Sequence, residues 1–341
     1  MDTVDLTKYN TSARICGYVY NLLKNCIFEQ NILDIDILCK TGNEEITKQC
    51  NMVYKKSTRK GSAFPICISL NNCIGNSTIE NRHINLNDIV KIKLAVDIDG
   101  CIAIYCDTFI YSQTQQTNEQ TNVEQLEKQN TIKFLHNLKK DILKEMHSGN
   151  TNDEVKIMIE SKCTNNNCFP LPNLKSYQHF DDQIYNENGK YIVLNYKRMY
   201  DLKTDYLIME NECFEFLENE IYTIEISVVS ENNLESLKII TDDDNSKLHR
   251  FNDQFYSFKL KTAKQFYSTV FNKYNYNVFN MNEYLNDSKH KLGAKECKNM
   301  KVLDTFLTQY AFNNKNPVSV YSIAFTVCIR KDNSALMLKY N

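Results

Sequence analysis

The sequence predicts an α/β protein whose core is made of two related halves, because one order of elements occurs twice. Two helices followed by strands are expected within residues 13–111, and the same order is expected within residues 135–229. The chain has 341 residues, enough for two domains or for one large domain with an insertion. An apolar run near the end, residues 318–329, predicts a strand that returns to the core.

The first half is predicted from two helical patterns and three apolar runs. Apolar residues recur at helical spacing from Ala13 to Leu23, and a less regular pattern continues from Ile35 to Val53. A basic turn at residues 55–61 follows the second helix. Apolar runs separated by turns with Asn and Gly then predict strands, at residues 63–70, 89–96 and 102–111.

The second half begins after a polar stretch. Residues 112–130 are rich in Gln, Asn, Thr and Glu, which predicts a flexible link or an exposed extension. A helical stripe then runs from Leu135 to Met146, and Thr151 with Glu154 forms a capping box that begins another helix. Strands are expected at residues 191–195 and 221–229.

Residues 237–310 have a different character, with lysines and aromatics in helical patterns. Helices are expected at residues 259–274, 281–292 and 296–310. Strand-like runs resume afterwards, at residues 318–329 and 335–340. We therefore interpret residues 237–310 as a helical insertion, and residues 1–236 and 311–341 as the core that carries it.

Composition argues against several classes of protein. No run of about 18 apolar residues is present and the first residues include no apolar segment, so neither a membrane span nor a secretory signal is expected. None of the 13 cysteines is spaced C-x-x-C, and no phosphate-binding glycine loop occurs. Because no secretory signal is expected, the cysteines are interpreted as core residues or free thiols of a reducing compartment. We expect a cytoplasmic protein, with the nucleus or nucleolus as further locations, and no cofactor.

Three stretches resemble the type II methionine aminopeptidases. Residues 60–73, KGSAFPICISLNNC, resemble the family's strand "kG-x-AFP…S-x-NNC". Residues 87–100 begin NDIVKI and end DIDG, like the hairpin "GD-x-VKID…H-x-DG", and EIYTIE at residues 220–225 resembles "E-V-Y-A-I-E". The stretches follow the family's order. This resemblance implies the pita-bread fold, with two pseudo-symmetric halves and the helical insertion of type II members.

Other segments resemble the proliferation-associated, ErbB-3-binding-protein-like branch, whose members bind ribosomes and are not peptidases. The segments are Lys8-Tyr9, FKLKTAKQFYSTV at 258–270, KLGAKEC at 291–297 and Phe325-Thr326-Val327. The resemblance implies a monomer that binds the large ribosomal subunit, its rRNA and its tunnel-exit proteins. Assembly, export, translation regulation and capping of idle ribosomes are all compatible with that binding.

The resemblance also locates the positions that hold two metal ions in active members. Those enzymes use two Asp, one His and two Glu, with a further His that assists catalysis. The positions correspond here to Lys93, Ile104, His179, Glu225 and Ala324, and to Asn76 for the assisting His. Only His179 and Glu225 keep a ligand type, and the residues before His179 depart from the family's pattern. Two ligands do not hold two metals, so we predict a pseudoenzyme without metal.

Within this vestigial pocket, the sequence allows a salt bridge in place of the metal. Lys93 would carry an ammonium group where the family has a carboxylate, and Glu225 would be its partner. Without such a role, His179 is an ordinary polar residue and Glu225 is a buried acid with some other partner.

Two groups of basic residues are candidates for contacts with RNA phosphates, which position a protein without reading sequence. The first is Lys55, Lys56, Arg59 and Lys60, in the turn before the AFP strand. The second lies in the insertion and comprises Lys259, Lys261, Lys264, Lys291 and Lys295, extended by Lys289 and Lys298. The alternative is a solvated lysine face.

Two competing functions remain open at this stage. The vacated pocket would bind a peptide or protein without any association with ribosomes, or rearranged metals would support residual aminopeptidase activity.

Overall fold

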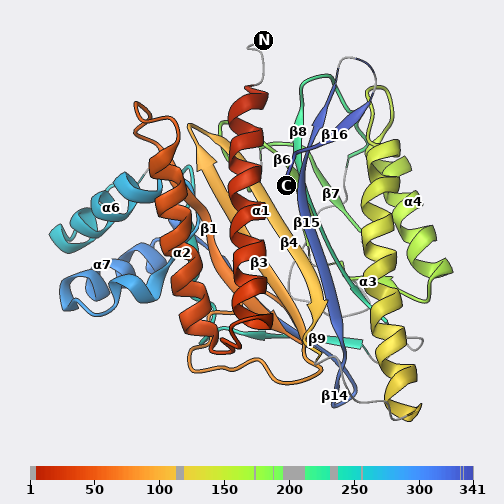
Figure 1. The fold of residues 1–341 in the computed structure, drawn as a ribbon. Coiled ribbons are helices and arrows are strands. Elements are labelled where there is room, and N and C mark those ends of the chain that lie inside the picture. The colour runs from red at the N-terminus through yellow and green to blue at the C-terminus, as the bar shows by residue number, and fades with distance from the viewer. Residues whose placement is uncertain are drawn as a thin grey trace.

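Four long helices cover one face of a nine-stranded sheet (Figure 1). The computed structural model describes residues 5–112, 119–172, 174–186, 188–194, 212–230, 237–254, 256–330, 332 and 334–340, without the side chains of residues 119–123. The helices are α1 (Leu6–Phe28), α2 (Ile35–Met52), α3 (Glu119–Glu145) and α4 (Asn152–Asn165). Within the described residues, none of the helices is both long and apolar enough to cross a bilayer.

The sheet is antiparallel and follows the order β1-β3-β4-β15-β8-β6-β7, while β16 pairs with β15 and β5 pairs with β8. The first half of the chain supplies the first three strands, so the halves meet between β4 and β15. The bounds are β1 Lys60–Leu70, β3 Ile89–Ile98, β4 Cys101–Ile110, β5 Phe169–Pro170, β6 Lys175–Gln178, β7 Tyr191–Val193, β8 Ile221–Val229, β15 Val320–Ile329 and β16 Ala335–Met337.

Side chains alternate between the two faces of the sheet, as the period of a strand requires. On β3, Ile92 and Leu94 pack into the main core beneath the helices, whereas Ala95 belongs to a second apolar cluster. Lys91 and Lys93 share the face of Ala95 by the same alternation. The face turned away from the helices is therefore where polar side chains of the central strands meet.

The predicted helix pairs are confirmed, and Thr151 and Glu154 form the predicted capping box. The prediction for residues 112–130 was wrong from residue 119 onward, because α3 begins there. Gln, Glu and Lys are good helix formers, so a polar stretch of this composition favours a helix once its end packs on the sheet. Residues 113–118 lie outside the described residues.

The insertion contains strands as well as helices. Its sheet has the order β11-β10-β12, and helices α6 and α7 lie beyond α2 at the β1 side of the molecule (Figure 1). Phe251, Phe266 and Phe279 form part of its own apolar core. The bounds are β10 Leu248–Phe251, α6 Lys261–Tyr274, β11 Phe279–Asn280, the 3₁₀ helix η1 Met281–Tyr284, α7 Ser288–Asn299 and β12 Leu303–Phe306.

The predicted helix at residues 296–310 was wrong beyond Asn299, because β12 pairs with β10 there. The helix expected at residues 281–292 is a 3₁₀ turn followed by the start of α7. Pairing with a strand distant in sequence overrides local helical spacing. The division of the chain at residues 237 and 310 stays a prediction.

A small four-stranded sheet joins this region to the first half of the chain. Its order is β14-β13-β2, with β9 paired to β13. The bounds are β2 Cys73–Gly75, β9 Leu237–Asp242, β13 Thr308–Asn313 and β14 Asn316–Pro317.

The hydroxyl group of Tyr340 forms hydrogen bonds across the boundary between the two halves. The register of β4 and β15 contains only two pairs, Ala324 with Cys106 and Phe325 with Tyr105. Beside them, the Tyr340 hydroxyl donates to the Ile104 carbonyl at 2.6 Å and accepts from the Thr326 amide at 2.8 Å. The C-terminal segment thus supplies hydrogen bonds that the strand ladder lacks.

A glycine on α1 makes room for this segment. A Cβ on Gly17 would lie 1.5 Å from the carbonyl oxygen of Tyr340. Any larger residue at this position would displace the chain that carries the Tyr340 hydroxyl.

We expect Tyr340→Phe to lower the free energy of unfolding by about 2–4 kcal/mol, because it leaves a buried carbonyl and a buried amide without partners. Urea denaturation measures the change. Tyr18→Phe, at a half-exposed position on α1, is the matched control and should change stability by less than about 0.5 kcal/mol. Equal effects of the two substitutions would contradict the role assigned to Tyr340.

Candidate functional site

Four residues form one row across the central strands. Lys93 on β3 is paired with Cys106 on β4, Cys106 with Ala324 on β15, and Ala324 with Glu225 on β8. Three strand spacings of about 4.8 Å separate the ends of the row, so the outer Cα atoms lie about 14 Å apart. Only a long side chain at one end can reach its partner at the other.

Lys93 and Glu225 meet above the two small residues. The Lys93 Nζ atom lies 2.7 Å from Glu225 Oε2, and both side chains are largely buried. The salt bridge predicted from the sequence is therefore present. Cys106 and Ala324 leave the space in which the ammonium and the carboxylate approach one another, whereas a Glu at residue 324 would fill it.

Aromatic rings enclose this pair in what we call the aromatic box, made of Phe64, Tyr185 and Phe306. The Lys93 Nζ atom lies 4.4 Å from the centroid of the Phe64 ring, within the range of a cation–π contact. The Tyr185 hydroxyl donates to Glu225 Oε1 at 2.6 Å. Phe306 packs edge-on against Phe64 and Tyr185, with centroid distances of 5.5 and 4.8 Å.

Burial, and then the charge of Glu225, raises the pKa of Tyr185. Its hydroxyl accordingly stays protonated and remains a donor to the carboxylate. Both oxygens of Glu225 are thereby satisfied, one by an ammonium and one by a phenol, which is what a buried carboxylate requires.

The residues present do not fit the metals that the fold family implies. An ammonium group at Lys93 repels a cation, and the side chains of Ile104 and Ala324 offer no lone pairs. Nowhere in the described ranges do three His, Cys, Asp or Glu side chains come together as a potential metal site.

The space left beside the ion pair is small. The cavity lined by Asn76, Lys93, Glu225 and Ala324 measures about 30 Å³, room for one or two water molecules. Pockets for small ligands usually occupy about 300–1,000 Å³. The Asn76 amide donates to the Leu307 carbonyl at 3.3 Å and so points back into the protein. The cavity is too small for the first residue of a peptide.

His179 is a half-buried, neutral side chain. Its Nε2 atom lies 2.8 Å from the Thr223 hydroxyl, and Nδ1 lies 3.3 Å from the Tyr9 hydroxyl. Burial lowers the pKa of its imidazole to about 3. Neither His179 nor Ile104 lines the small cavity. His179 instead connects α1 to β8.

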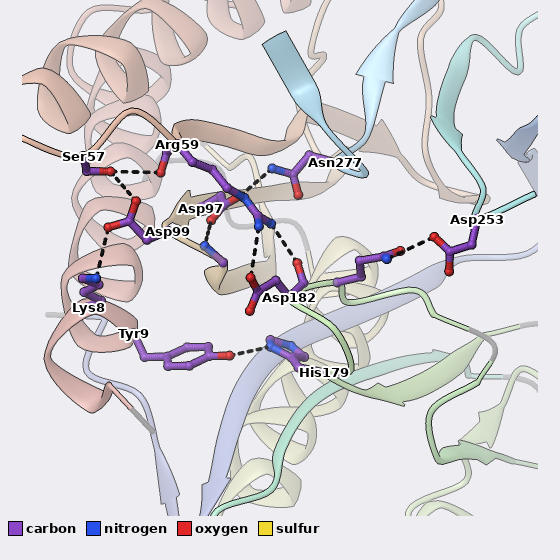
Figure 2. A network of polar contacts seen from close by, with 12 residues as sticks. Lys8, Tyr9, Ser57, Arg59, Asp97, Asp99, His179, Asp182, Asp253 and Asn277 are labelled. Carbon is purple, nitrogen blue, oxygen red and sulfur yellow. Dashed lines mark hydrogen bonds and ion pairs between the residues drawn. The ribbon is translucent and has the colours of Figure 1, made fainter. Parts of the chain in front are cut away.

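Two residues of the basic turn are exposed, and the other two bind to neighbouring parts of the protein. Lys55 and Lys56 are exposed. Arg59 instead pairs with the buried Asp97 at 2.9 Å and with Asp182 at 3.2 Å (Figure 2). Lys60 Nζ donates to the Val53 carbonyl at 2.9 Å near the end of α2. Half of this predicted RNA-binding cluster thus makes internal contacts.

Figure 2 shows how far this network extends. Asn277, from the insertion, donates to Asp97 at 2.7 Å, while Lys8 on α1 pairs with Asp99 at 3.0 Å. Asp97 pairs with Arg59 and Tyr185 donates to Glu225, but neither residue was predicted from the sequence. Asp97 lies in the DIDG motif, which was a usable signal, whereas Tyr185 lies in no quoted motif.

The seven lysines predicted as a basic group of the insertion, which we call the insertion lysines, are exposed. Lys261 and Lys264 occupy the first turn of α6, Lys259 lies just before it, and Lys291 and Lys295 lie on α7. Lys261 begins α6, so the helix predicted at residues 259–274 starts two residues later than expected. Lys289 and Lys298, on α7, are exposed as well.

A tight contact holds the two helices together. A Cβ on Gly293 of α7 would lie 2.5 Å from the Thr262 carbonyl in the first turn of α6. The lysine-bearing start of α6 is therefore fixed against the middle of α7. None of the seven insertion lysines forms an ion pair with another described residue.

Comparisons with known proteins agree with this geometry. The chain is 26% identical to an ErbB-3 binding protein 1 of Solanum tuberosum, over 96% of this chain and 80% of that protein. It is 25% identical to a curved DNA-binding protein of Schizosaccharomyces pombe, over 87% of this chain and 74% of that protein. No protein-family model matches the chain.

Solved structures settle the fold. A thermophilic Arx1 matches 99% of this chain and 91% of its own, with a TM-score of 0.77 and 18% identity. The chain has the pita-bread fold. A methionine aminopeptidase from Thermotoga maritima also matches, with a TM-score of 0.60 and 9% identity, over 100% of this chain and 98% of its own. The resemblance to the methionine-aminopeptidase-like family and to its proliferation-associated branch is confirmed.

We expect Lys93→Met and Glu225→Leu each to lower the free energy of unfolding by about 3–5 kcal/mol, because each leaves a buried charge or a buried donor without its partner. The double variant Lys93→Met with Glu225→Leu should recover most of that loss. Denaturant unfolding of all three variants gives the coupling energy. Additive losses in the double variant would show that the two side chains do not act as a pair.

Acidification should destabilise the fold through His179. Its pKa in the folded state is about 3, below the usual 6.5, so the unfolded chain binds the proton first. The stability that neutral His179 contributes is present above pH 6.5 and is lost as pH falls toward 3.

Between pH 6 and 4, we expect the free energy of unfolding to fall more steeply for the natural chain than for His179→Gln. The slopes should differ by about 1.4 kcal/mol per pH unit. Identical slopes in urea titrations across this range would contradict the neutral state of His179.

Proposed function

We propose that this protein is a non-catalytic factor that binds the large ribosomal subunit near the peptide exit, through RNA phosphates. The observation that carries the proposal is a contrast between two sets of lysines. Lys93 fills the old catalytic centre and neutralises its carboxylate, whereas the insertion lysines project into solvent without acidic partners.

The residues of the centre support the proposal that the chain is not a peptidase. Three of the five ligand positions hold Lys93, Ile104 and Ala324, and an aminopeptidase of this fold needs its metals to activate water. The remaining space admits water and not a peptide. The ammonium of Lys93 and the aromatic box thus preserve the structure of the site without its chemistry.

The whole chain has a net charge of −2, so binding to phosphates must depend on local groups of positive charge. Lys259, Lys261 and Lys264 lie together at the start of α6, and α7 adds further lysines. Each phosphate that a lysine neutralises releases counterions, so affinity must fall steeply as salt rises. Lys55 and Lys56 add a smaller exposed group.

The sequence resemblance to the ribosome-binding branch supports the ribosome as the partner. The Schizosaccharomyces pombe relative, named as a curved DNA-binding protein, is consistent with affinity for nucleic acid in this group. We propose a monomer that contacts rRNA and tunnel-exit proteins in the cytoplasm, with the nucleus or nucleolus as further sites of action.

We expect the protein to co-sediment with large ribosomal subunits at low salt and to dissociate as salt rises. Replacing Lys259, Lys261 and Lys264 by alanine should weaken binding at least tenfold, because about three phosphate contacts are lost. Sucrose gradients of lysate, and binding of the purified chain to purified subunits, measure the effect.

The matched control replaces Lys133, Lys140 and Lys144 on α3, which are also exposed and carry the same charge. That variant should bind like the natural chain. Equal weakening by both triple variants would indicate a non-specific effect of charge, and no co-sedimentation at any salt concentration would refute the proposal.

A peptidase assay tests the other half of the proposal. With cobalt or manganese and a peptide that begins with Met, we expect no cleavage above a metal-only blank, because the site cannot hold two cations. Metal-dependent release of Met that is lost in Glu225→Gln would refute the non-catalytic assignment.

A further inference from the structure

The free edge of the main sheet opens into a cleft. β1 is the last strand of that sheet and pairs with β3 alone. On its other side, the Ala63 carbonyl accepts from the Val278 amide at 2.9 Å, and the Ile66 amide donates to Asn43 at 3.3 Å. No hydrogen bond outside the ladder with β3 is described for the main chain at residues 60–62. This short stretch therefore resembles an edge strand that lacks a partner.

The cleft beside this edge has a volume of about 820 Å³, within the range of pockets that bind ligands. One wall is the face of α2 that carries Lys40, Asn43 and Thr47. The other is the end of α6 and the segment after it, which carries Asn272, Asn275 and Asn277. Lys60, Gly61 and Ser62 line the cleft between them.

Two features of the edge itself indicate that it can receive another chain. A Cβ built on Gly61 meets no atom within 4 Å, so the space beside this residue is open. The Ser62 hydroxyl is buried and has no hydrogen-bond partner. An unpaired polar atom at this depth costs about 1–3 kcal/mol, and a turn of the Ser62 side chain toward the cleft would let a bound ligand recover it.

The chemistry of the walls favours a peptide over a nucleic acid. Amide side chains of Asn43, Asn51, Asn272, Asn275 and Asn277 line the cleft, and each can both donate and accept. The cationic groups are mostly engaged. Arg59 pairs with Asp97, and Lys273 pairs with Glu283. Lys40 faces a cleft that also holds Glu44. The lining holds four cationic and three acidic side chains, so its charges nearly cancel, and its amide groups can donate to and accept from the backbone of an extended chain.

We propose that this cleft binds a short extended peptide segment of a partner protein, which adds to the edge of β1 at residues 60–62. Main-chain hydrogen bonds supply the affinity, as in other cases of strand addition. The asparagine side chains of α2 and of the insertion bind the outer side of the peptide. The site is separate from the insertion lysines, so it operates whether or not the chain binds ribosomes.

A randomised heptapeptide library displayed against the full chain provides the probe. We expect recovered peptides to bind the natural chain and to slow hydrogen exchange of the amides at residues 60–62. Thr47→Trp fills the cleft from an exposed position on α2 and should weaken binding at least tenfold.

Lys48→Trp is the matched control, because Lys48 is the next exposed residue of α2 and lies outside the cleft. It should leave peptide affinity unchanged. The proposal is overturned if no peptide is recovered above background, or if Thr47→Trp and Lys48→Trp bind peptides equally. It is also overturned if single-stranded RNA, and not a peptide, protects the same amides.

Discussion

The ion pair between Lys93 and Glu225 is the interaction on which the centre of this fold depends. It joins β3 of the first half to β8 of the second across two intervening strands, where the register of β4 and β15 contains only two pairs. In a pita-bread enzyme, metal ions held by both halves occupy this place. In this chain, the ammonium group of Lys93 supplies a positive charge beside Glu225 and is its partner.

The residues around Lys93 and Glu225 satisfy the needs of a buried ion pair. A buried ammonium and carboxylate are tolerated only when every donor and acceptor is satisfied. Tyr185 satisfies the second oxygen of Glu225, and the face of Phe64 lies against the ammonium. Cys106 and Ala324 must be small for the side chains to meet at all. The loss of a ligand at residue 324 and the gain of a lysine at residue 93 are therefore two parts of one change.

Because an ion pair fills the centre of the fold, we propose that function resides on its outer surfaces. The insertion presents lysines that a tight contact between α6 and α7 at Gly293 holds together, and the edge of β1 presents main-chain groups to a polar cleft. Arg59 lines this polar cleft. It looked like part of a basic surface, yet it neutralises Asp97, whose Oδ2 atom also accepts from Asn277 of the insertion.

The sequence by itself determined the fold family and most helices, and it predicted which metal-ligand positions are replaced, because residue types at motif positions carry that information directly. Lys93, Ile104 and Ala324 cannot ligate a metal in any arrangement. Only the tertiary structure decided that Lys93 reaches Glu225, that Arg59 faces inward and that residues 303–306 form a strand. Each of these features depends on partners that are distant in the chain, and Lys93 and Glu225 are 132 residues apart. Local periodicity in the sequence does not predict such pairings.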